Sequence, residues 1–206
     1  MGRVSDAKQR LMDAVLELMW TGSYGSTTID DICEKAGVKK GSFYYFFESK
    51  CDLATAALEA DWEVRRPKLD AVFSPTVSPL ERLRNFCDYA YQKQVEMRAK
   101  CGCVLGCPLN TLGSEICTQE HGLQLKIQQI LAYHRKYVEG AIRDAHAEHL
   151  IEAPNASEKA DMIQAYFEGV LTQARIQNDV EAIKQLPRGI SAILGLKEAE
   201  LSLAHN

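Results

Sequence analysis

The sequence predicts an all-α protein in which an N-terminal three-helix head with a helix-turn-helix precedes a larger C-terminal helical bundle. Three observations predict this fold. Apolar residues recur at helical spacing almost throughout the 206 residues, a glycine separates two short amphipathic segments near the N-terminus, and no stretch alternates as a β-strand does. Counting the periodic segments gives about nine helices.

Composition and charge restrict the class of protein. Hydrophobic residues make up 46% of the chain, which is enough for a packed core, and the net charge of −4 still permits a local basic patch. The polar N-terminus lacks the apolar stretch of a signal peptide, and no apolar run approaches the roughly 20 residues of a membrane-spanning helix. We therefore expect a soluble, cytoplasmic protein with no membrane partner.

The first 50 residues contain signals for three helices. Apolar periodicity predicts a first helix over 6–21, and Thr28 with Asp31 forms a capping-box pattern that opens a second. Gly37 is expected to end the second helix, and a short third helix is predicted over 39–46. The predicted domains are 1–50 for the head and 51–206 for the body.

Caps and prolines mark the helices of the body. Ser49 with Asp52 opens a long helix, which Pro67 is expected to kink or to end near Arg66. Ser78 is expected to cap the next helix, which runs to about residue 100.

The rest of the body follows the same logic. Residues 101–113 hold three glycines and a proline and are predicted to be a loop with at most one short helical turn, and a long helix is predicted over 114–150. Asn155 with Glu158 caps the eighth helix, and Asn178 with Glu181 caps a ninth, which Pro187 is expected to bend.

Residues 27–53 carry the most informative pattern. Two short helices meet at Ala36-Gly37-Val38, where Gly37 can take the positive φ of a tight turn. This arrangement is typical of a helix-turn-helix, whose second helix enters the major groove of DNA. Residues 35–50 hold four lysines against the single acid Glu48, so this stretch is basic within an acidic chain.

The same segment resembles the head of the TetR (tetracycline-repressor-like) family, whose pattern is roughly Thr-[Val/Ile]-x-x-Ile-Ala-x-x-Ala-Gly-Val-Ser-x-Gly-[Ser/Thr]-[Leu/Phe]-Tyr-x-[His/Tyr]-Phe-x-x-Lys-x-x-Leu. Three positions depart from it, namely Cys33, Lys39 and Phe46. The matching residues are Thr28, Ile29, Ile32, Ala36, Gly37, Val38, Gly41, Ser42, Phe43, Tyr44, Phe47, Lys50 and Leu53.

The resemblance implies a dimeric DNA-binding transcriptional regulator, most often a repressor that a small-molecule inducer releases from DNA, with no cofactor. It also assigns roles by position. Thr28, Tyr44 and Lys50 would bind phosphates, whereas Phe43 and Phe47 are expected to be core. The residues that would face base edges are Lys39, Lys40, Ser42 and Tyr45, while Thr27 adds a hydroxyl group and Gly41 permits close backbone approach to DNA.

Two apolar stripes near the C-terminus allow two interpretations. Such stripes are usually core within one chain. The resemblance implies instead that the last two long helices pair with a second copy, where Ala165 and Gly169 would permit close approach, and that the homodimer binds a palindromic operator. The stripes comprise Ile163, Tyr166, Phe167, Val170, Leu171 and Ala174, followed by Val180, Ile183, Leu186, Ile190, Ile193 and Leu194.

An inducer pocket is expected between the helices of the body. Aromatic residues there are either ordinary core or the walls of this pocket. The candidate lining residues are Trp62, Phe86, Tyr89, Tyr133, Tyr166 and Gln173.

The chain has seven cysteines, and four of them lie between 101 and 117. In one interpretation Cys107 is a reactive sensor of electrophiles or oxidants near a helix N-terminus, where a thiol ionises more readily, and Cys101, Cys103 or Cys117 resolves it. A subgroup of the resembled family carries a similar Gly-Cys-x-x-x-x-x-Leu-x-x-Glu stretch, matched here by Gly106, Cys107, Leu112 and, one residue later, Glu115.

Other interpretations of the cluster stay open. The cysteines could bind a metal together with His121, although the spacing is not a standard zinc pattern. They could also be small packing residues beside a non-covalent inducer site. An enzyme would need Cys107 with His121 or His134, which leaves the head unexplained, so we expect no enzymatic activity. Cys33, Cys51 and Cys87 lie on apolar stripes and are expected to be buried and inert.

Overall fold

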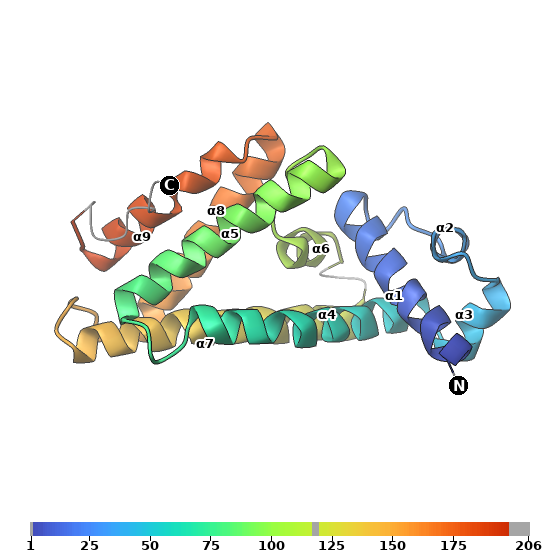
Figure 1. Ribbon diagram of the computed structural model, residues 1–206, viewed down its shortest axis with the longest axis horizontal. Coiled ribbons are helices and arrows are strands. Elements are labelled where there is room, and N and C mark those ends of the chain that lie inside the picture. Colours follow the sequence, from blue (N-terminus) through green and yellow to red (C-terminus); the bar gives the residue numbers. More distant parts are fainter. Residues whose placement is uncertain (1, 117–119, 198–206) are drawn as a thin grey trace. The chain divides into compact units, whose positions relative to one another are not determined.

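The computed structural model describes residues 2–116 and 120–197, and within these ranges it contains nine α-helices, one 3-10 helix and no strand (Figure 1). The predicted all-α fold is confirmed. None of the described helices combines the length and apolarity that a membrane span requires. The elements are α1 Gly2–Thr21, α2 Ile29–Ala36, α3 Lys40–Phe46, α4 Lys50–Val72, α5 Pro79–Cys101, α6 Pro108–Ile116, α7 His121–Ala147, α8 Ala156–Gln177, the 3-10 helix η1 Glu181–Gln185 and α9 Leu186–Leu194.

The helices form two compact units. The first comprises Met1–Arg65 with Pro108–Leu131, and the second comprises Arg66–Cys107 with the chain from Ala132 onward. Helices α4 and α7 each contribute residues to both units. The expected functional division at residue 50 is a separate matter and stays a prediction.

The first unit is built around α1. Leu11 of α1, Ile32 of α2, Phe43 of α3 and Leu53 of α4 are all fully buried, and α1 packs against α2, α3 and α6. Burying side chains of this size stabilises the unit by roughly 1.5–3 kcal/mol each. The core therefore contains side chains from the three N-terminal helices and from the start of α4, and α6 packs against α1.

The second unit is built around α5 and α8. Leu83 of α5, Ile142 of α7, Ile163 of α8 and Ile190 of α9 are fully buried. Helices α8 and α9 pack together, and η1 contacts both α5 and α8 (Figure 1). Arg82 in α5 is itself buried and is paired with Asp144 of α7, which satisfies its charge.

The side-chain caps predicted for α2 and α8 are confirmed, whereas Ser78 precedes α5 without a side-chain cap hydrogen bond. The Thr28 hydroxyl accepts the N–H of Asp31 at 3.1 Å, and the Asp31 carboxylate accepts the N–H of Thr28 at 2.8 Å, which is the predicted capping box. The Asn155 side chain accepts the N–H of Glu158 at 3.2 Å, as predicted for α8.

Two predictions in the middle of the chain were wrong, and one alternative of a third is excluded. Of the kink or end expected at Pro67, the end near Arg66 is excluded, because α4 continues through Pro67 to Val72. Trp62 and Leu69 on either side of the proline are buried in their units. Residues 108–116 are not a loop but the helix α6. The long helix expected over 114–150 is shorter at both ends, since α7 begins at His121 and ends at Ala147.

The C-terminal prediction was also wrong in detail. Asn178 does not cap a ninth helix but ends α8 in the left-handed conformation, with φ of 51°. The Asp179 carboxylate instead accepts the N–H of Glu181 at 2.9 Å at the start of η1. Pro187 does not bend a helix but lies in the first turn of α9, where its missing N–H costs nothing.

Candidate nucleic-acid interface and sensor loop

The turn between α2 and α3 has the predicted geometry. Gly37 ends α2 in the left-handed conformation with φ of 63°, and its N–H donates to the backbone carbonyl of Glu34 at 3.0 Å. The Arg10 guanidinium of α1 donates to the carbonyls of Ala36 at 2.9 Å and Gly37 at 3.3 Å. Hydrogen bonds from Arg10 of α1 therefore hold the turn in place, and the turn sets the orientation of α3 relative to α2.

Helix α3 has one face in the core and one in solvent. Phe43 and Phe47 are buried, as predicted, whereas Tyr44 is 56% exposed and Tyr45 is 75% exposed. A tyrosine ring has an apolar body and a hydroxyl group that can donate a hydrogen bond. This face can place hydroxyl groups and aromatic edges against a second molecule.

The basic residues lie around the same face. Lys39 precedes α3 in an extended conformation without a side-chain cap, and it is exposed. Lys40 and Gly41 are exposed as well, and Ser42 is half-buried. The Lys40 ammonium is 2.8 Å from a carboxylate oxygen of Asp30, an exposed pair that an approaching phosphate can replace.

Two of the expected DNA-binding residues have internal partners instead. Thr27 is buried, and its hydroxyl donates to the Ser23 carbonyl at 2.7 Å. The Lys50 ammonium donates to the carbonyls of Tyr24 at 2.7 Å and Thr27 at 2.8 Å. The Lys50 ammonium also lies 4.1 Å from the centre of the Tyr24 ring, so Lys50 holds the loop between α1 and α2 in place.

The other side of that loop is held by two carboxylates whose contacts with it were not predicted from the sequence. Glu115 of α6 accepts the N–H groups of Tyr24 at 3.0 Å and Gly25 at 2.6 Å, and it accepts the Ser23 hydroxyl at 2.5 Å. Glu120 accepts the Tyr24 hydroxyl at 3.2 Å. Desolvation raises the pKa of Glu115, but its hydrogen bonds outweigh this effect and leave the pKa below its usual value.

In the second unit, side chains of α5 and α8 and the Asn178 side chain bond to the backbone of the loop before α6 at Val104, Leu105 and Gly106. Buried Gln94 of α5 accepts the N–H groups of Leu105 at 3.2 Å and Gly106 at 2.9 Å, and it donates to the Gly106 carbonyl at 3.0 Å. Arg175 donates to the Leu105 carbonyl at 2.8 Å, and Asn178 accepts the Val104 N–H at 2.9 Å. Residues 102–107, which we call the sensor loop, are therefore held rigidly.

Gly106 gives this loop its shape. Its φ is +65°, and a Cβ atom there would lie 3.1 Å from the Leu171 carbonyl oxygen and 3.3 Å from the Arg175 Cβ. Only glycine takes this conformation at no steric cost. The loop can therefore approach α8 closely, which brings the following residue, Cys107, to Glu168.

Cys107 and Glu168 form a hydrogen-bonded pair of thiol and carboxyl group. Burial raises the pKa of Glu168 to about 7, although the hydrogen bond from Cys107 lowers it in part. The second carboxyl oxygen of Glu168 is buried and has no hydrogen-bond partner. Cys107 itself forms no disulfide and is partly exposed.

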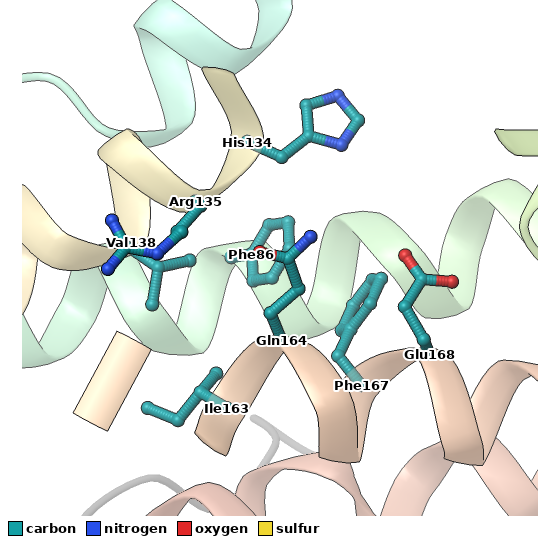
Figure 2. A pocket seen from close by; sticks show the side chains of 8 residues that line it. All are labelled: Phe86, His134, Arg135, Val138, Ile163, Gln164, Phe167 and Glu168. Atoms are coloured by element: carbon teal, nitrogen blue, oxygen red, sulfur yellow. The ribbon is translucent and has the colours of Figure 1, made fainter. Parts of the chain in front are cut away.

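Glu168 also lines a small cavity of about 20 Å³. Figure 2 shows Gln164, Phe167 and Glu168 extending from α8, with the Phe86 ring from α5 next to Phe167. The centres of these two rings are 4.7 Å apart and the rings are stacked. Space of this size holds a water molecule rather than an organic ligand. The full lining is Phe86, His134, Arg135, Val138, Ile163, Gln164, Phe167 and Glu168.

Of the six aromatic or amide residues expected to line an inducer pocket, Phe86 lines this cavity. Trp62 is buried in the first unit, Tyr89 and Tyr133 are half-buried, and Gln173 is exposed. The Tyr166 hydroxyl donates to the Gln185 carbonyl at 3.0 Å. The role of these residues in ligand binding stays a prediction.

Among the described residues, the other cysteines form no metal-binding cluster. Cys33 and Cys87 are buried as expected, whereas Cys51 is only partly buried, and burial raises the pKa of all three thiols. Within residues 2–116 and 120–197, no three His, Cys, Asp or Glu side chains lie close enough to hold a metal ion. Cys117, which the metal interpretation needs, lies outside the described residues.

The face of α8 that points to solvent differs from the apolar stripe that the sequence suggested. Ile163, Val170, Leu171 and Ala174 of that stripe are buried in their own chain. The exposed face is narrow and made of apolar, small and amide side chains at helical spacing: Met162, Ala165, Gly169, Gln173 and Ile176.

Comparison with known proteins agrees with this architecture. Residues 11–57 match the family described as bacterial regulatory proteins, tetR family, and residues 79–190 match the tetracyclin repressor-like C-terminal domain.

Three curated relatives show the range of similarity. The chain is 29% identical over 175 residues to the transcriptional regulator AcuR of Cereibacter sphaeroides. This match covers 83% of this chain and 77% of the relative. The chain is 24% identical over 182 residues to the HTH-type transcriptional repressor DhaR of a Mycobacterium species, which covers 86% and 87%. An uncharacterized HTH-type transcriptional regulator of Lactococcus lactis is 24% identical, and the match spans 62% of this chain and 63% of the relative.

Solved structures share the fold over most of the chain. A regulatory protein TetR from Rhodobacter sphaeroides superposes with a TM-score of 0.79 at 26% identity, covering 91% of this chain and 98% of the other. A TetR-family regulator from Agrobacterium tumefaciens gives a TM-score of 0.82 at 19% identity, covering 93% and 99%.

Proposed function

The chain belongs to the TetR family of bacterial regulatory proteins and is a DNA-binding transcriptional regulator, and we propose that it is a repressor released from DNA when a small electrophile modifies Cys107. The single observation that supports the sensing step is the pairing of the partly exposed Cys107 thiol with the buried Glu168 carboxyl group. Repression itself is supported by the similarity to DhaR, which is described as a repressor.

For DNA binding, we propose that α3 enters the major groove. Its exposed face offers Tyr44 and Tyr45, with Lys39 and Lys40 at its start. Phosphates attract the lysines independently of sequence, while hydroxyl and ammonium donors can read base edges. Thr28 and Gly41 are exposed at the same helix-turn-helix. Lys50 and Thr27 contribute by holding the α1–α2 loop, and Ser42 lies half-buried on α3.

The operator follows from symmetry. Two copies that pair through the exposed face of α8 form a two-fold dimer, whose recognition helices must reach major grooves roughly 34–36 Å apart. A two-fold protein binds a palindromic site. Such a regulator acts in the cytoplasm, where thiols stay reduced until an electrophile arrives.

Release from DNA requires that the modified protein prefer a conformation with weaker operator affinity. Cys107 immediately precedes Pro108, the first residue of α6. Glu115 at the other end of α6 holds the loop that leads into α2. A covalent adduct at Cys107 therefore acts at the start of a helix whose far end is bonded to the DNA-binding head.

The test measures operator affinity by fluorescence anisotropy, using a palindromic fragment from the promoter next to the gene. Treatment with N-ethylmaleimide should weaken binding by about tenfold or more in the wild type, in the range usual for coupled sites. Cys107→Ser should keep its affinity after the same treatment. Cys51→Ser is the matched control, because Cys51 is also partly exposed. If Cys107→Ser releases DNA as readily as the wild type, the sensing proposal is wrong.

A further inference from the structure

The hydrogen bond between Cys107 of the sensor loop and Glu168 of α8 places a proton acceptor next to the thiol. The Cys107 thiol donates a hydrogen bond to the Glu168 carboxyl group, and the side chains of Gln94, Arg175 and Asn178 hold the loop that carries Cys107. A thiol held against a carboxyl group by a rigid loop is arranged for proton transfer, since nothing has to move before the proton does.

The surroundings of Glu168 favour uptake of that proton. One of its oxygens is buried without a hydrogen-bond partner, and apolar side chains of Phe86, Val138 and Phe167 line the cavity beside it. A carboxylate in such a setting lacks the solvation that stabilises its charge, so the neutral acid is favoured more than in water.

One cation near Glu168 is paired with other acids. Arg135 lines the same cavity, but its guanidinium is bonded to Asp161 and Glu139. His134 lines the cavity as well. The Glu168 carboxyl group therefore borders an apolar cavity on one side and is hydrogen-bonded to the Cys107 thiol on the other.

We propose that Glu168 is the proton acceptor that converts Cys107 to the reactive thiolate when a small α,β-unsaturated carbonyl compound reaches it. This inference rests on the proposed function. The sulfur forms a bond to the β-carbon while the carbon–carbon π bond breaks and its electron pair moves to the α-carbon. The thiol proton passes to Glu168 and from there to the α-carbon. The product is a thioether, with no change of oxidation state that requires an outside reagent.

The same residue links the adduct to the fold. A thioether cannot donate the hydrogen bond that the thiol gave, so the buried carboxyl group of Glu168 loses that donor after the reaction. Leaving a buried polar group without its partner is unfavourable. Modification thereby destabilises the arrangement of sensor loop and α8 that the reduced protein adopts.

The test follows alkylation of Cys107 by N-ethylmaleimide, with the adduct on the Cys107 peptide quantified by mass spectrometry between about pH 5.5 and 9. In the wild type the rate of Cys107 alkylation should increase with pH over the range in which Glu168 ionises. In Glu168→Gln, which keeps the size of the side chain but cannot take a proton, the rate near neutral pH should fall by about tenfold or more. Its profile should rise only at the pH of an ordinary thiol, about 8.5.

Three comparisons make this test specific. Glu168→Asp keeps a carboxyl group and should restore part of the rate. Glu148→Gln removes an exposed acid of the same unit and should leave the rate unchanged. Melting temperatures of all variants show whether each is folded.

Two outcomes would overturn the inference. If Glu168→Gln reacts faster, the carboxyl group merely keeps the thiol protonated, and if it reacts at the wild-type rate, Glu168 takes no part. The proposed function fails separately, since Cys107 could be alkylated as expected while operator affinity stays the same.

Discussion

The carboxylate of Glu115 accepts the backbone N–H of Gly25 at 2.6 Å. This contact joins the last turn of α6 to the loop between α1 and α2, and the same carboxylate also accepts the N–H of Tyr24. Lys50 donates to two carbonyls of the loop. The loop is therefore fixed by an anion on its amides and a cation on its carbonyls, and its end carries Thr28, the cap of α2.

Removing the anion should loosen the head. Glu115→Ala loses hydrogen bonds to two backbone amides and one hydroxyl, and because Glu115 is exposed, we expect a loss of only about 1 kcal/mol of unfolding free energy. Operator affinity should fall as well. Urea denaturation and anisotropy measure the two effects, with Glu148→Ala as an exposed control. An unchanged stability and affinity in Glu115→Ala would contradict the role of this contact.

The same contact predicts a pH dependence. The pKa of Glu115 is lowered in the folded protein, so its ionised form stabilises the fold above the pKa of the unfolded chain, about 4.3. This contribution is lost as the pH falls through the folded value. The difference in melting temperature between wild type and Glu115→Gln should therefore be largest near neutral pH and shrink in acid. A difference that grows on acidification would exclude this explanation.

Most local signals in the sequence predicted the local structure correctly, although the pattern of Asn178 and Glu181 did not, and features that depend on distant contacts were missed. The capping box of Thr28 and Asp31 and the turn at Gly37 need only neighbouring residues. Gly113 suggested a loop, yet it lies within α6, where a Cβ would be 3.4 Å from the Ile127 side chain of α7. A glycine that permits close packing has the same sequence signal as one that breaks a helix.

The candidate site shows the same limit. Exposure of Tyr44 and Tyr45 agrees with their place in the family pattern, but nothing in that pattern indicates that Lys50 holds two carbonyls of a loop 23 and 26 residues earlier. Glu168 was missed for a related reason. One acid on an amphipathic helix has no distinguishing sequence signal until the fold brings Cys107 to it.

Lys39 and Lys50 should differ in what they contribute. Lys39 is exposed, so Lys39→Ala should leave stability within about 0.5 kcal/mol while reducing the salt dependence of DNA affinity by about one charge. Lys50→Ala removes two hydrogen bonds from a half-buried ammonium and should cost about 1–2 kcal/mol of stability besides weakening DNA binding. Urea titrations, with anisotropy at about 50 to 200 mM salt, separate the two effects. Equal stability of both variants would show that Lys50 has no structural part.

Gly106 and Gly102 provide a matched pair for the sensor loop. Both have positive φ, of +65° and +77°, but a Cβ at Gly102 would meet nothing within 4 Å. Each change to alanine costs roughly 1–2 kcal/mol for the left-handed backbone. Gly106→Ala should lose about a further 1–2 kcal/mol, because its Cβ presses on Leu171 and Arg175. Thermal unfolding measures the difference in stability between the two variants. Equal losses of stability would mean that the loop can shift away from α8 to accommodate the added Cβ.

Ile176 on α8 and Val64 on α4 test the dimer face, since they are equally exposed, at 71% and 72%. If the face of Met162, Gly169 and Ile176 pairs with a second copy, Ile176→Glu places two charges in an apolar interface and should raise the dimer dissociation constant by about 30- to 100-fold, or roughly 2–3 kcal/mol. Val64→Glu makes the same chemical change outside that face and should leave the dimer intact. Sedimentation velocity over a concentration series measures both. Operator affinity should fall with dimerisation in Ile176→Glu, because a single head reaches only one half-site. An Ile176→Glu protein that sediments as the wild type does would place the interface elsewhere.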